Sequence, residues 1–137
     1  MATASLVYRD PAFVARGNES ELISALVRPH FSDAGEWLTF FCFDPEGRLL
    51  SACENGGRGR SSVAVTPVMV RAVISSGYNA QLLVAHNHPS GELRPSPDDL
   101  TLTRRIVALC ELCGMMVSDH LILTCAGHFS FRQAGLL

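Results

Sequence analysis

Two histidines separated by a single residue are the strongest chemical feature of the sequence. His86 and His88 follow an apolar run at residues 82–85, which predicts a buried strand. Side chains alternate between the two faces of a strand, so both imidazoles point the same way if the strand continues through them. Imidazoles are rarely gathered on an apolar face without a partner, because their ring nitrogens need hydrogen bonds. The pair therefore indicates a metal site at the end of this strand.

A carboxylate from the next element could supply a third ligand. A loop rich in Pro, Ser and Gly follows His88, and Asp98 and Asp99 then stand at the start of an expected helix. Both acids are candidates, because they are adjacent. Three protein ligands leave the fourth position of a zinc ion to water, as in catalytic sites. Ser96 and Asp99 also fit a capping box, and that purely structural role could explain both residues.

A hydrolytic zinc site also needs a base for its water, and glutamate is the usual choice. The upstream candidates are Glu36, Glu46 and Glu54. Glu46 lies in an expected turn, where exposure to solvent is sufficient to explain it. Glu36 begins an aromatic-rich segment and could face the site from the edge of a sheet. Spacing along the chain does not choose among the three.

The composition bounds the class of protein. A chain of 137 residues, 47% hydrophobic and 18% charged, is expected to fold as one domain. The net charge of -2 and the pI of about 6.2 give no electrostatic support for wholesale nucleic-acid binding. No apolar run approaches the roughly 18 residues that span a membrane, and the N-terminus lacks the pattern of a secretory signal. We expect a cytoplasmic protein without a membrane partner.

The five cysteines form an odd number and stand mostly within apolar runs. This pattern is typical of reduced, buried thiols. Cys110 and Cys113 form a C-x-x-C pair inside an expected helix. Redox pairs of this type normally lie at a helix N-terminus, where the thiolate is stabilised, so core packing is the favoured interpretation.

The elements that must position these residues alternate between helices and strands. Extended segments are expected at residues 37–43, 48–52, 80–86, 115–118, 121–125 and 128–131, and helices at 22–27, 68–75 and 97–113. Thr66-Pro67 and Ser96-Pro97 each combine an N-cap residue with proline at the first helical position. Residues 54–62 are expected to form a flexible loop. The order predicts an α/β fold with a mixed β-sheet flanked by helices.

The arrangement His86-x-His88, seven residues, Ser96, two residues, Asp99 resembles the signature of the JAMM (MPN+) metalloproteases. The longer run from His86 to Gly91, with Asp119-His120-Leu121-Ile122 further on, is similar to the RadC branch of that group. The resemblance implies a JAMM/cytidine-deaminase-like architecture. It also implies a single RadC-like JAB/MPN+ domain at residues 18–137 after an N-terminal arm at 1–17. We expect the helix-hairpin-helix segment of full-length RadC proteins to be missing.

The same resemblance implies roles for individual residues. His86, His88 and Asp99 would bind zinc, Glu36 would be the general base, and Ser96 would donate to the oxyanion. The implied activity is that of a zinc metallohydrolase, a metallopeptidase or isopeptidase acting on a peptide or protein substrate. Two alternatives are a non-catalytic MPN-type binding module and an accessory protein in DNA repair, which the charge does not support. The oligomeric state stays open, with a homodimer among the partners considered.

Overall fold

The computed structural model of the chain describes residues 3–7, 27–28, 35–57 and 64–137. The strands in these ranges are β1 (Thr3–Val7), β2 (Glu36–Phe43), β3 (Leu49–Gly57), β4 (Gln81–Asn87), β5 (Met116–Thr124) and β6 (Gly127–Ser130), and the helices are α2 (Pro67–Ser75) and α3 (Pro97–Leu112). Neither of these two helices is long and apolar enough to cross a membrane. The predicted helix at 22–27 lies outside the described residues except for its last position.

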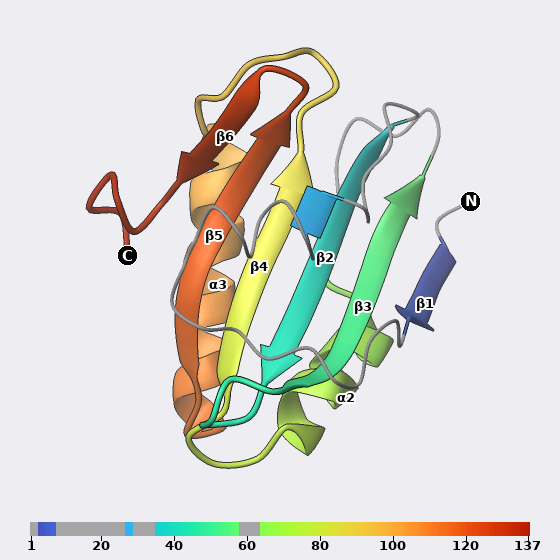
Figure 1. Cartoon of the computed structure of the whole chain (residues 1–137), viewed down its shortest axis with the longest axis vertical. Coiled ribbons are helices and arrows are strands. Elements are labelled where there is room, and N and C mark those ends of the chain that lie inside the picture. Colours follow the sequence, from blue (N-terminus) through green and yellow to red (C-terminus); the bar gives the residue numbers. More distant parts are fainter. Residues whose placement is uncertain (1–2, 8–26, 29–34, 58–63) are drawn as a thin grey trace.

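The strands form one sheet in the order β1-β3-β2-β4-β5-β6 (Figure 1). The pair β4 and β5 is parallel, and the other neighbouring pairs are antiparallel. Parallel neighbours need a long crossover connection, which α3 provides between the end of β4 and the start of β5. The mixed sheet flanked by helices confirms the predicted α/β fold.

Apolar side chains cover both faces of the sheet. Along β2, Phe40 joins the core beneath the helices, whereas Phe41 joins the core on the opposite face. Figure 1 shows α2 and α3 on the same side of the sheet. Their contributions to the core on that side include Met69, Val73, Ile106 and Cys110. Because both faces of the central strands are buried, the ends of β2 and β4 have a well-defined position.

Two strands are longer than predicted. Residues 115–118 and 121–125 were expected as separate strands, but β5 runs without interruption through the polar residues between them. Its neighbours β4 and β6 pair with it, and His120 is buried within the strand with hydrogen-bonding partners. The expected loop at 54–62 is also wrong for its first part. There β3 continues to Gly57, because β1 and β2 pair with it on both sides.

The cysteines are free, and most of them are buried. Cys42, Cys53 and Cys110 agree with the prediction, whereas Cys113 is half-buried and Cys125 is exposed. Burial raises the pKa of Cys110 to about 12, with smaller contributions from neighbouring thiols. A thiol with so high a pKa is a poor nucleophile, which supports core packing rather than redox chemistry for the C-x-x-C pair.

Candidate metal centre

The predicted ligands meet at the carboxyl end of β4. His86 is the penultimate residue of β4, His88 follows the strand directly, and Asp99 lies in the first turn of α3. A loop joins the two elements, and Gly91 within it has a φ of +87°, a backbone conformation that favours glycine. The N–H of Gly91 donates to the carbonyl of His88 at 3.0 Å, which closes a turn. The strand end and the helix start are thereby brought together.

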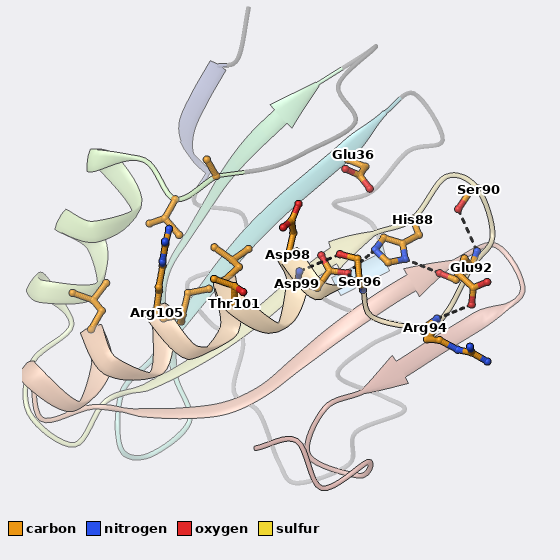
Figure 2. Close-up of a pocket in the computed structure, with 15 residues that line it drawn as sticks. Glu36, His88, Ser90, Glu92, Arg94, Ser96, Asp98, Asp99, Thr101 and Arg105 are labelled. Atoms are coloured by element: carbon orange, nitrogen blue, oxygen red, sulfur yellow. Dashed lines mark hydrogen bonds and ion pairs between the residues drawn. The ribbon is translucent and has the colours of Figure 1, made fainter.

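The side chains of His86, His88 and Asp99 converge on one point. His86 Nε2 lies 3.3 Å from Asp99 Oδ1, and His88 Nε2 lies 3.2 Å from Asp99 Oδ2. The two Nε2 atoms are 2.9 Å apart. One potential ligand atom from each residue lies within 4.8 Å of the other two. Asp98, the alternative acid, is exposed and points away from this cluster (Figure 2).

Asp99 belongs both to the cluster of candidate ligands and to the capping box at the start of α3. Ser96 is the N-cap of α3, and its Oγ accepts the Asp99 N–H at 3.1 Å. In return, Asp99 Oδ2 accepts the Ser96 N–H at 2.8 Å. Burial alone would raise the pKa of Asp99, but the neighbouring His86 and His88 and the hydrogen bond from the Ser96 backbone hold this pKa well below its usual range. The capping box therefore fixes an ionised carboxylate beside the two imidazoles.

The orientation of His88 is set by a backbone carbonyl. His88 Nδ1 lies 2.6 Å from the carbonyl oxygen of Glu92. A carbonyl only accepts, so Nδ1 carries the hydrogen and Nε2 of the neutral ring presents a lone pair to Asp99. A hydrogen bond from the protonated ring to Asp99 raises the pKa of His88 above its ordinary value, against an opposing effect of burial. In the neutral ring, Nε2 is thus ready to act as a ligand.

The donor set fits a zinc ion. Two imidazole nitrogens and a carboxylate are typical ligands of catalytic zinc sites. The Nε2 atoms of His86 and His88, 2.9 Å apart, are close enough to face the same ion. The Nδ1 atoms of both rings are engaged on the outer side, with Glu92 O for His88 and His120 Nε2 for His86. Outer hydrogen bonds of this kind orient histidines that bind metals.

Glu36 faces the same cavity as the cluster. The cavity has a volume of about 850 Å³ and continues along α3 as far as Leu109. Its lining includes Glu36, His88, Ser96 and Asp99, but neither Glu46 nor Glu54 (Figure 2). Burial raises the pKa of Glu36, although the nearby His88 and His86 act in the opposite direction. Among the glutamates considered from the sequence, Glu36 alone lines this cavity.

Asn87 is a functional candidate that the sequence reasoning did not single out. Its Oδ1 accepts the N–H of Trp37 at 2.7 Å, and its Nδ2 donates to the carbonyl of Gly35 at 2.9 Å. These two backbone groups flank Glu36. Asn87 therefore holds the segment that carries the candidate base Glu36. The one sign of its importance in the sequence was its place between the two candidate ligands His86 and His88.

His120 is a second functional candidate to which the sequence reasoning assigned no role. It lies on β5, is completely buried, and approaches His86 Nδ1 to within 2.7 Å. The sequence contained one indication, since Asp119-His120-Leu121-Ile122 is part of the resemblance to RadC proteins. That resemblance did not assign a role to the residue.

The mixed sheet and the cluster at the end of β4 are those of an α/β domain of the JAB/MPN type. Residues 18–136 match the model of the RadC-like JAB domain, and the chain belongs to this family. It is similar to a UPF0758 protein of Porphyromonas gingivalis, 33% identical over 123 residues, which cover 87% of this chain and 53% of the relative. A UPF0758 protein of Aquifex aeolicus is 50% identical over 56 residues, 41% of this chain and 24% of the relative. The chain spans about half of the first relative's length and a smaller part of the second.

Proposed function

We propose that this domain is a zinc-dependent hydrolase that cleaves peptide or isopeptide bonds in a peptide or protein substrate. One observation carries the proposal. The Nε2 atoms of His86 and His88 converge with the Asp99 carboxylate at the wall of the cavity that Glu36 also lines. The RadC-like JAB family supports it, because the intact ligand pattern is the feature that resembles the JAMM signature.

The protein's own groups are suited to proton transfer. Bound zinc would polarise a carbonyl and lower the pKa of its water toward about 7. The burial that raises the pKa of Glu36 makes its carboxylate a better base. Glu36 would take a proton from water and pass it to the leaving amine.

Ser96 would stabilise the oxyanion. Its Oγ accepts the N–H of Asp99, which fixes the side chain at the cavity wall while its own hydroxyl hydrogen remains able to donate. A hydrogen bond to the developing negative charge would strengthen in the transition state, as in other oxyanion sites. The capping geometry therefore pre-organises the donor.

The cavity is large enough for part of an extended chain. Its volume of about 850 Å³ lies within the range of roughly 300–1,000 Å³ that is usual for ligand sites. It runs from the cluster along α3, where Leu102 and Leu109 add apolar surface. A peptide lying along this groove would bring one carbonyl to the metal end.

Elemental analysis of the purified protein combined with a peptide-library cleavage screen tests this function. We expect about one zinc per chain and cleavage by the wild type. His88→Ala should lose both the zinc and the cleavage. Asp98→Asn is the matched control, because Asp98 is an adjacent acid that lines the same cavity but does not join the cluster. This variant should retain zinc and turnover.

The other outcomes are equally informative. Stoichiometric zinc without cleavage of any library peptide would favour an MPN-type binding module over an enzyme. Absence of zinc from the wild type after supplementation would refute the proposed metal site. Equal loss of zinc in His88→Ala and Asp98→Asn would show that the cluster is not the binding site.

A further inference from the structure

A buried chain of hydrogen bonds connects the backbone of α3 with the outer side of His86. Thr103 Oγ1 lies 2.7 Å from the carbonyl oxygen of Asp99 and 2.6 Å from His120 Nδ1. The other nitrogen of the ring, His120 Nε2, lies 2.7 Å from His86 Nδ1. Thr103 is 5% exposed and His120 is 0% exposed, so water does not compete with these bonds.

The direction of each hydrogen bond follows from the first one. The carbonyl of Asp99 can only accept, so the hydroxyl hydrogen of Thr103 points to it. Thr103 Oγ1 must then accept the Nδ1–H of His120. Because a fully buried imidazole is neutral, His120 Nε2 has a lone pair and accepts the Nδ1–H of His86. The remaining nitrogen, His86 Nε2, is left with a lone pair facing the cluster.

We propose that His120 and Thr103 are positioning residues that select the tautomer of His86 in which Nε2 is available as a metal ligand. The inference rests on the proposed metal site. The hydrogen bonds run from the backbone of Asp99 to His86 Nδ1, and His86 Nε2 lies 3.3 Å from Oδ1 of the same Asp99, so contacts on both sides complete a circuit between the two residues. Two ligands of the site are thereby joined through the interior of the protein as well as across the cluster.

Packing alone does not account for His120. Its ring stacks on Phe131 with centroids 4.3 Å apart and planes 10° from parallel, a contact that another aromatic residue could also make. Both ring nitrogens are instead used, in a region where unpaired polar groups are costly. An aromatic replacement would keep the stacking and remove only the hydrogen bonds, which makes the two roles separable.

The tautomers can be measured directly in the metal-free protein. Long-range ¹H–¹⁵N correlation spectra of histidine-labelled protein at pH 8 should show His86 and His120 protonated at Nδ1 and not at Nε2. Finding the hydrogen of His86 on Nε2 would overturn the inference. This measurement does not require the protein to bind zinc, so its result is independent of the proposed function.

Variants test the consequence for the metal. His120→Phe keeps a ring beside Phe131 and should weaken zinc binding about 10- to 100-fold in a chelator competition. Thr103→Val removes the hydroxyl at nearly constant volume and should weaken zinc binding in the same direction, with His86 no longer held in one tautomer. Thr103→Ser retains the hydroxyl and should bind zinc within about threefold of the wild type.

The proposed role of Thr103 and His120 in selecting the His86 tautomer would be refuted if Thr103→Val bound zinc as tightly as Thr103→Ser and the His86 tautomer were unchanged. If His120→Phe does not fold, the two Thr103 variants and the tautomer measurement still decide the question. A wild type that binds no zinc but shows the expected tautomers would overturn the proposed function while supporting the selection of the tautomer.

Discussion

The side chain of Asn87 accepts the backbone N–H of Trp37 at 2.7 Å, although 50 residues separate them in the chain. Through its Nδ2, the same side chain also donates to the carbonyl of Gly35. Two hydrogen bonds from Asn87, the last residue of β4, therefore hold the backbone on either side of the candidate base Glu36. Asn87 stands between His86 and His88, the two candidate ligands. This relationship couples the position of the candidate base to the position of the candidate metal site.

Asn87→Asp should disturb the position of Glu36 while leaving zinc binding nearly unchanged. The carboxylate can still accept the Trp37 N–H, but it places an acceptor against the carbonyl of Gly35. We expect a loss of about 1–3 kcal/mol of stability, together with a lower kcat. Zinc affinity should change less than threefold, because the ligands are untouched. Chemical denaturation, chelator competition and cleavage assays measure the three quantities, and an unchanged kcat would show that the anchor does not position the base.

Glu36→Gln should abolish turnover without removing the metal. The amide keeps the size of the side chain but cannot accept a proton, so kcat should fall by at least about 10²-fold. Glu46→Gln is a matched control, because Glu46 is an exposed glutamate outside the cavity. Cleavage kinetics and elemental analysis should show a low kcat with full zinc in the first variant and wild-type behaviour in the second. Near-normal turnover in Glu36→Gln would exclude this residue as the base.

Zinc affinity should weaken as the pH falls. The pKa of His88 is raised above its ordinary value by Asp99, and only the neutral ring offers a lone pair to zinc. Above this raised pKa no proton competes, whereas below it the Kd should rise by about tenfold per pH unit for one displaced proton. The lowered pKa of Asp99 keeps its carboxylate ionised throughout this range. Chelator competition at a series of pH values measures the slope, and a Kd independent of pH would contradict the assignment of His88 as a ligand.

Gly56→Ala should destabilise the fold at the end of β2 that begins with Glu36. A Cβ atom at Gly56 would lie 2.2 Å from the carbonyl oxygen of Glu36, and the φ of +144° already disfavours side chains. Gly77→Ala is the control, since its φ of +89° is also unfavourable but there is open space around it. Both variants should lose stability from backbone strain of order 1 kcal/mol, and Gly56→Ala should lose clearly more. Equal midpoints in thermal denaturation would show that the contact with β2 is readily relieved.

Much of the fold could be predicted because its determinants are local. Thr66-Pro67 and Ser96-Pro97 begin α2 and α3 as expected, since an N-cap and a proline act on the backbone beside them. The limits of β3 and β5 were predicted less well. Polar residues suggested a loop at 54–62 and a break before 121, but pairing with neighbouring strands on both sides extends each strand through such residues.

The types and spacing of the donors could be read from the sequence, because His86 and His88 are two residues apart at the end of a strand and the Ser96–Asp99 box is local to one helix start. The resemblance to RadC proteins added Asp99 and Glu36 as the members of the site. How these residues are held depends on contacts that form in the folded chain. The hydrogen bonds of Asn87 to Trp37 and of His86 to His120 join residues 50 and 34 positions apart. Strand pairing brings such residues together, and chain spacing contains no information about contacts created by that pairing.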